Sequence, residues 1–309
     1  MRRMSGMLVA VGILLISAAG SAAVWLLTRP HPISERERAS AFDRAADPDN
    51  GRLLFAAGDC ASCHASPGQT DRLHLGGGLA LASTYGTFRV PNISPDPQYG
   101  IGKWTLKDFA NALLTGVSPD GSHYYPVFPY PSYTRMTIQD AADLFAYLKT
   151  LKPVAERPPP KELPPPFNIR RFVGFWKLLY FRPGMLMPDP RRDEKWNRGR
   201  FLVEGPGHCA ECHSSRDMFG GIKEATRFAG GKDPGGTGFA PNLTPTGLGS
   251  WSEKDIVEVL TTGFTPNHRR VGSSMADVVI NTAMLPETDR DAIAAYIKSL
   301  PPKPTPQAQ

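Results

Sequence analysis

The stretch GDCASCHA, residues 58–65, places two cysteines three positions apart and a histidine directly after the second. The same grouping returns 149 positions later as GHCAECHS, residues 207–214. The chain has 309 residues and four cysteines, and all four belong to these two stretches. A repeated motif that uses every cysteine indicates one chemistry, carried out twice.

Disulfide, zinc and haem chemistry all use paired cysteines, and the spacing distinguishes them. Cysteines three positions apart in a helical turn rarely close a disulfide without strain unless they serve redox exchange, and no βαβ pattern of a thioredoxin-like site is visible. The pairs lie too far apart for a compact zinc ribbon, and zinc would not need the extra histidines. The spacing instead predicts two covalently attached c-type haems. The residues assigned are Cys60, Cys63 and the proximal ligand His64 for the first haem, and Cys209, Cys212 and His213 for the second.

The sequence around the two motifs repeats as well. PNISP at 91–95 corresponds to PNLTP at 241–245, and GKWTLKDFANALLTG at 102–116 corresponds to GSWSEKDIVEVLTTG at 249–263. A final pair, LFAYLKTLKP and AIAAYIKSLPP, keeps the same order and nearly the same offset. We therefore predict one duplicated domain. The boundaries are an N-terminal segment at 1–30, haem domains at 40–153 and 191–303, a connecting region at 154–190 and a tail at 304–309.

Each copy is predicted to consist of short helices separated by loops, so the fold class is all-α with two tandem domains. Gly51 to Ala57 form a short helix that Gly58 ends. Later helices begin at pairs of a hydroxyl residue and an aspartate three positions on, which is the pattern of a helix N-cap. These pairs are Thr105 with Asp108, Thr137 with Asp140, Ser252 with Asp255, and Thr288 with Asp291.

The first thirty residues predict export. Arg2 and Arg3 precede an uncharged apolar run from Met7 to Leu27, long enough at about 1.5 Å per residue to span a ~30 Å hydrocarbon core. The small residues at 21–23 resemble a cleavage site, but the apolar run continues beyond them. We expect an uncleaved helix in the bacterial inner membrane with the rest facing the periplasm, or a soluble periplasmic protein if the leader is cut.

The charge excludes one class of partner. The formal net charge is +6, and three of the arginines lie in the first thirty residues, so the rest is close to neutral. No run of basic residues interleaved with aromatics indicates nucleic acid binding. We expect no nucleic acid partner.

Each half resembles a small c-type cytochrome. The features are a glycine and an aromatic residue one turn apart before the motif (Gly51, Phe55), a Gly-Ile segment followed by Trp104, and a final helix that carries Tyr147. In that fold the first and last helices cross, and the tryptophan indole points at a haem propionate. The resemblance implies this role for Trp104 and Trp251, although packing as plain core is the alternative. The second half departs from the pattern, because Val203 replaces the aromatic residue.

The stretches YYPVFPYPSYTRMT and GSSMADVV resemble more closely the multihaem cytochrome subunits of bacterial periplasmic dehydrogenases that oxidise alcohols, sugar acids or aldehydes. The resemblance covers about residues 45–303, but those subunits generally carry three haem domains. It implies Met136 as the distal iron ligand of the first haem, with His123 as the rival. For the second haem it implies Met275, with Met284 as the competitor because of its distance from the last helix.

The connecting region combines two kinds of sequence. Residues 153–168 are rich in proline and favour an extended, semi-rigid spacer. Residues 169–184 mix aromatic and basic residues in a predicted helix. This helix either serves a membrane surface or a partner, or packs between the two haem domains.

These features predict a dihaem electron carrier. We expect it to pass single electrons from a periplasmic dehydrogenase, or a quinol-linked donor, to a soluble cytochrome or a terminal oxidase. The alternative is a dihaem enzyme such as a peroxidase or a thiosulfate-oxidising cytochrome. A peroxidase needs an open distal site and the second enzyme a spare cysteine, whereas the chain offers methionines and no further cysteine.

Overall fold

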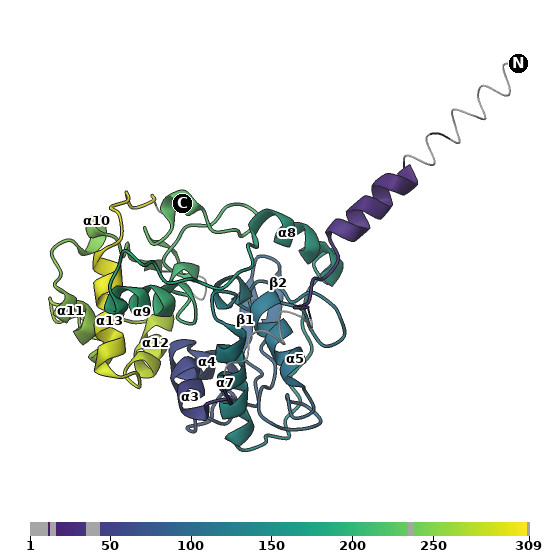
Figure 1. Cartoon of the computed structure of the whole chain (residues 1–309), viewed down its shortest axis with the longest axis horizontal. Coiled ribbons are helices and arrows are strands. Elements are labelled where there is room, and N and C mark those ends of the chain that lie inside the picture. Colours follow the sequence, from purple (N-terminus) through teal and green to yellow (C-terminus); the bar gives the residue numbers. More distant parts are fainter. Residues whose placement is uncertain (1–11, 13–16, 35–43, 234–237, 308–309) are drawn as a thin grey trace, which may run out of the picture.

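The structure is a computed structural model that describes residues 12, 17–34, 44–233 and 238–307. It is mainly helical, as predicted, and its elements fall into a first and a second half joined by a connecting helix (Figure 1). The first half and the connecting region contain α3 (Pro48–Ala57), α4 (Cys60–His64), β1 (Ala80–Ser83), β2 (Gly86–Arg89), α5 (Leu106–Ala110), the π-helix η1 (Asn111–Thr115), α6 (Tyr130–Tyr133), α7 (Ile138–Thr150), η2 (Arg170–Phe172) and α8 (Val173–Tyr180). The second half contains α9 (Glu194–Glu204), η3 (Cys209–Glu211), η4 (Glu224–Thr226), β3 (Gly231–Lys232), β4 (Phe239–Ala240), α10 (Pro245–Leu248), α11 (Glu253–Thr262), α12 (Ser274–Thr282) and α13 (Glu287–Lys298).

The core of the first half forms where α3 crosses α7. Gly51 makes the close approach possible, because a side chain there would collide with the main-chain oxygen of Asp143. One turn further on, the rings of Phe55 and Tyr147 lie 5.4 Å apart. Phe55 is 1% exposed, and both rings belong to the hydrophobic cluster of the first half.

The second half uses the same crossing between α9 and α13. A side chain at Gly199 would collide with the main-chain oxygen of Ala292, as at Gly51 in the first half. Val203 is buried, and the aromatic contact missing there is made by Trp196, whose ring lies 5.2 Å from that of Tyr296. The sequence analysis did not identify Trp196, because it precedes the glycine by one turn instead of following it.

Three of the four predicted helix starts are confirmed. Thr105, Thr137 and Ser252 each accept a hydrogen bond from the main chain three residues on, and the aspartate there completes a capping box. The fourth is wrong: α13 begins at Glu287 with Pro286 before it, so Thr288 lies inside the helix. Proline at this boundary ends the preceding turn, and the helix needs no side-chain cap from Thr288.

The all-α prediction missed two short antiparallel ribbons. Strand β1 pairs with β2, with Ala80 opposite Arg89, and β3 pairs with β4, with Gly231 opposite Ala240. Each ribbon follows one of the two Cys-x-x-Cys-His turns in the chain. The strands have two to four residues, too few to produce a recognisable alternating pattern in the sequence.

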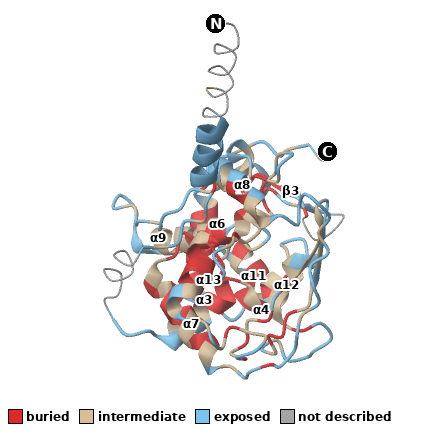
Figure 2. Ribbon diagram, turned by 90° about the vertical axis from the view of Figure 1, so that its right-hand side faces the viewer, coloured by how far each residue is buried: buried red, intermediate tan, exposed pale blue. Residues whose placement is uncertain are grey.

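The connecting helix α8 packs on one side and is exposed on the other. The Nζ of Lys177 donates to the main-chain oxygens of Thr115 and Gly116 at the end of η1, at 2.7 and 2.8 Å. Tyr180 donates to Asp217 of the second half at 2.7 Å. The opposite side, which includes Phe175 at 43% exposure, is open. The helix therefore contacts both halves, and Figure 2 shows buried segments beneath it.

The prediction of an inner-membrane location is contradicted. Among the residues that the structure describes, no helix is both long and apolar enough to cross a membrane. The rest of the predicted anchor, residues 1–11 and 13–16, lies outside the described residues.

Candidate functional site

Both cysteine motifs form tight turns with reduced thiols. Cys60 to His64 form the short helix α4, preceded by Asp59 in the left-handed conformation with φ 51°. In the second half His208 has the same conformation, with φ 38°, ahead of a 3-10 turn that begins at Cys209. All four cysteines are free and half-buried. Each turn therefore holds two free cysteines three positions apart, the pairing that attachment to a porphyrin requires.

The two motif histidines are oriented in the same way. The Nδ1 of His64 lies 2.8 Å from the main-chain oxygen of Pro91, and the Nδ1 of His213 lies 2.7 Å from that of Pro241. A carbonyl can only accept, so Nδ1 carries the proton and Nε2 keeps its lone pair. An imidazole held in this tautomer is suited to bind a metal through Nε2.

Burial determines the protonation of these groups. It lowers the pKa of His64 to about 4, although the hydrogen bond to Pro91 acts in the opposite direction. Burial likewise lowers the pKa of His213. It raises the pKa of Cys63 to about 11 and that of Cys209 to about 12. Before a haem is attached, burial therefore keeps the histidines neutral and the cysteines protonated near neutral pH.

A repeated Pro-Asn dipeptide holds each histidine loop in place. Asn92 follows Pro91 and donates through Nδ2 to the main-chain oxygens of Val154 and Glu156, at 2.7 and 3.0 Å. Asn242 follows Pro241 and donates to Lys303 in the same way at 2.9 Å. The repeat is visible in the sequence as PNISP and PNLTP, but its role depends on these tertiary contacts. The sequence feature that could have indicated this role is the recurrence of the dipeptide in both halves at a constant offset.

The first half buries Met136 in the cluster around its cysteine motif. Met136 is 2% exposed, and Cys60 and Trp104 pack against the same cluster. The rival His123 is also buried, but its Nε2 lies 2.9 Å from the main-chain oxygen of Thr28. The arrangement favours Met136 over His123 as the residue that faces the haem site.

In the second half the two competing methionines have different surroundings. Met275, at the start of α12, packs against the cluster that includes Cys209 and Trp251. Met284 is 44% exposed and is not part of that cluster. The arrangement favours Met275, although Met284 matches the position of Met136 in the sequence repeat.

The two predicted tryptophans are half-buried beside their clusters. Within the described part of the chain, neither the Trp104 nor the Trp251 indole N–H donates a hydrogen bond, so both donors are available to an anionic group. A repeated lysine holds each tryptophan loop. Lys149 donates to the main-chain oxygen of Gly102 at 2.6 Å, and Lys298 donates to that of Trp251 at 2.6 Å. The sequence analysis did not identify these lysines.

The two cysteine turns meet where the halves contact each other. The main-chain oxygen of Gly58, just before the first motif, accepts a hydrogen bond from the Tyr133 hydroxyl at 3.2 Å. The same oxygen lies 3.3 Å from Nε2 of His208, the residue before Cys209. The Tyr133 and His208 rings lie 5.7 Å apart. One main-chain oxygen therefore connects both motifs.

Polar contacts on either side complete this junction. From α12, the Nδ2 of Asn281 donates to Asp59 and, at 3.0 Å, to Ser62, so that the second half contacts the first cysteine turn. From α6, Ser132 donates to Glu211 at 3.1 Å, so that the first half contacts the second turn. Each turn is thus contacted by a helix of the opposite half.

A helical fold with two Cys-x-x-Cys-His turns and neutral histidines defines the class of c-type cytochromes. The residues present fit a haem group, because each turn has two thiols and an imidazole whose Nδ1 is hydrogen-bonded to the main chain.

Comparisons with known proteins agree with this class. The profile of the cytochrome c family matches residues 48–152. A dihaem c-type cytochrome of Cereibacter sphaeroides is 48% identical over 292 residues, which cover 94% of this chain and 97% of that protein. The cytochrome subunit of fructose dehydrogenase from Gluconobacter japonicus is 38% identical over 259 residues, 82% of this chain and 52% of the subunit. The cytochrome c subunit of a quinone-dependent alcohol dehydrogenase from Gluconacetobacter polyoxogenes is 40% identical over 270 residues, which cover 83% of this chain and 56% of that subunit.

The chain belongs to the dihaem c-type cytochromes, and its cofactors are covalently bound c-type haems. It spans about half the length of these two dehydrogenase subunits.

Proposed function

We propose that the protein is a dihaem electron-transfer subunit that accepts electrons from a dehydrogenase and passes them to a second cytochrome or an oxidase. The named relatives that are cytochrome subunits of fructose and alcohol dehydrogenases support the donor side. The bound haems supply reversible one-electron chemistry. The chain itself binds them, orients their ligands and limits their contact with water.

In this proposal the halves are two tandem haem domains, residues 40–153 and 191–303. Cys60 and Cys63 attach the first haem and Cys209 and Cys212 the second. His64 with Met136 and His213 with Met275 would hold the two irons, and the indole N–H groups of Trp104 and Trp251 would hold the propionates. Thioether ligation raises the reduction potential relative to two histidines, which suits transfer to a high-potential acceptor.

The junction of the two cysteine turns at Gly58 is the observation that carries the proposal. Thioether bonds from these cysteines would hold a porphyrin beside each turn, and the two turns share a main-chain oxygen. Because electron transfer slows steeply with distance, haems held there would favour transfer within the chain.

The optical spectrum of the purified protein tests the proposal. We expect two low-spin haems, the weak near-infrared band of methionine ligation, and no response of the reduced protein to carbon monoxide. Met136→Ala and Met275→Ala should each open one haem to carbon monoxide, because each removes one thioether. The matched control Met284→Ala, at a half-exposed residue, should leave the spectrum unchanged.

A carbon monoxide response in the unaltered protein would mean an open iron and would favour the peroxidase alternative. A response of Met284→Ala, with none from Met275→Ala, would overturn the ligand assignment of the second haem alone.

A further inference from the structure

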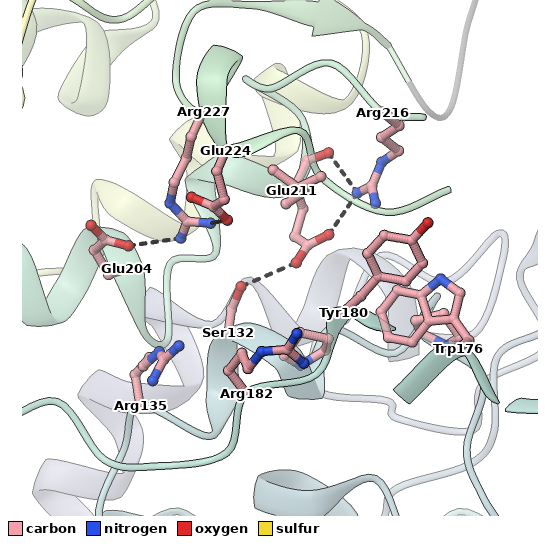
Figure 3. A pocket seen from close by; sticks show the side chains of 13 residues that line it. Ser132, Arg135, Trp176, Tyr180, Arg182, Glu204, Glu211, Arg216, Glu224 and Arg227 are labelled. Carbon is pink, nitrogen blue, oxygen red and sulfur yellow. Dashed lines mark hydrogen bonds and ion pairs between the residues drawn. The ribbon is translucent and has the colours of Figure 1, made fainter. Parts of the chain in front are cut away.

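A pocket of about 470 Å³ lies between the two halves and borders the second cysteine turn at Glu211. One wall comes from residues in and next to α6, and another from α8 and Arg182, which follows it. The remaining wall comes from the second half (Figure 3). No cysteine, histidine or methionine lines it. The proposed electron transfer gives this pocket no role.

The second-half wall of the pocket carries two arginines and three glutamates, all of them in ion pairs. Arg227 pairs with Glu204 at 2.7 Å and with Glu224 at 3.5 Å. Arg216 pairs with Glu211 at 2.6 Å. Figure 3 shows these pairs together on one side of the pocket. Both arginines on this wall already have carboxylate partners from the chain.

The arginines of the opposite wall have no carboxylate partner among the described residues. Arg135 donates to the main-chain oxygen of Gly184 at 3.0 Å, and Arg182 donates to that of Leu179 at 2.9 Å. Burial, and then the charge of Arg227, lowers the pKa of Arg135, whereas Glu204 and Glu224 act in the opposite direction. The lining carries four arginines against three glutamates, and a bound anion would offset the remaining positive charge.

Aromatic rings form a third wall. Trp176 and Tyr180 lie one turn apart on α8, with ring centroids 5.2 Å apart. Trp176 donates to the main-chain oxygen of Phe219 at 3.1 Å, and Tyr180 donates to Asp217. These hydrogen bonds hold both rings in place before any ligand arrives. Fixed aromatic faces suit a flat apolar group.

We propose that this pocket binds a small planar carboxylate, with its carboxylate held by Arg135 and Arg182 and its ring against Trp176 and Tyr180. The planar guanidinium fork matches a carboxylate and can bind it through two parallel hydrogen bonds. The volume lies within the range of small-molecule sites. The site goes beyond the proposed electron-transfer function, and carboxylate binding there does not depend on electron transfer.

Calorimetric titration of the haem-loaded protein with benzoate tests the site. We expect one benzoate per chain, at least ten-fold weaker binding of the neutral isostere benzamide, and at least ten-fold weaker binding of inorganic phosphate, which lacks a ring. The double variant Arg135→Gln/Arg182→Gln should weaken benzoate at least ten-fold. Arg191→Gln, at an arginine with 86% side-chain exposure outside the pocket, is the matched control and should bind as the unaltered protein does.

Three results would overturn the proposal: no saturable benzoate binding, equal benzoate binding by the double variant, or phosphate binding as tight as benzoate. The single variant Arg182→Gln keeps the test decisive if the double variant does not fold, because Arg182 is exposed and its loss leaves no cavity. It should weaken benzoate more than Arg191→Gln does. Haem content measured on each variant separates a lost site from a failure of the proposed electron-transfer function.

Discussion

At the scale of single residues, a buried carboxylate organises the start of the first half. Asp143 on α7 has no exposed surface and accepts hydrogen bonds from Asn50 at 2.7 Å, from the main chain of Asp47 at 2.8 Å, from Gln139 at 3.0 Å and from Arg44. Burial alone would raise the pKa of Asp143, but these hydrogen bonds outweigh it and hold the pKa below its usual value. The carboxylate joins the segment before α3 to α7.

This network predicts a pH dependence. A carboxylate with a lowered native pKa stabilises the fold above its unfolded pKa, and the contribution is lost as pH falls through the native value. The free energy of unfolding should therefore decrease on acidification, by up to about 1.4 kcal/mol per pH unit for one proton. Asp143→Asn should be less stable at neutral pH and show a shallower dependence.

Denaturant unfolding of the haem-loaded protein at several pH values measures this difference. Asp49→Asn, at an exposed aspartate on α3, is the control and should follow the unaltered protein. If the free energies of unfolding of Asp143→Asn and of the unaltered protein change with pH in the same way, Asp143 makes no contribution to the pH dependence.

At the scale of elements, α12 connects the two haem sites. Its first turn carries Met275, and its last turn carries Asn281, which is 1% exposed. Asn281 donates to Asp59 and Ser62 beside the first cysteine turn. Asp277, between them on the helix, pairs with Arg72 at 3.2 Å. One helix therefore holds the proposed distal ligand of the second haem and contacts the first haem turn.

Removing the Asn281 amide should weaken this junction. Asn281→Ala leaves Asp59 with one donor fewer in a buried position, so we expect a loss of about 1–3 kcal/mol in the free energy of unfolding. Asn281→Asp should cost more, because it puts a second carboxylate next to Asp59. Thermal and denaturant unfolding measure both, with Ile280→Ala at an exposed neighbour as control. The contact contributes nothing if Asn281→Ala is no less stable than Ile280→Ala.

At the scale of the whole molecule, each half has its own hydrophobic cluster. Most residues of the first cluster lie between Leu54 and Leu148, and most of the second between Leu202 and Leu300. The exceptions are Ala56 and Ala57 of α3, which belong to the second cluster and join it to the first half. Most of the apolar burial is therefore local to one half, and the junction is mainly polar.

Separate clusters predict that one haem can be lost without the other. The double variant Cys209→Ala/Cys212→Ala should retain one covalent haem per chain, measured by haem extraction and mass spectrometry of the intact protein. Cys60→Ala/Cys63→Ala is the matched variant in the other half and should also retain one. A chain that keeps two covalent haems after either change would contradict the assignment of the cysteines.

The repeated motifs account for what could be predicted. The helix that ends at Gly58, the capping boxes at Thr105, Thr137 and Ser252, and the cytochrome c class all follow from local sequence signals, because spacing and N-cap chemistry act over a few residues. The strands were missed because they are too short to show a period. Trp196 was missed because the aromatic contact moved to the other side of the glycine, where only the helix crossing brings it to Tyr296.

The sequence by itself determined the cofactor chemistry, because two cysteines and a histidine at this spacing suit one attachment reaction. The tertiary structure alone decided how Met275 and Met284 differ, since burial depends on the packing of α12 and sequence distance does not report it. It also decided the contact of the two turns through Gly58 and the pocket beside Arg135. Both join residues far apart in the chain, and only the packing of one half on the other brings them together.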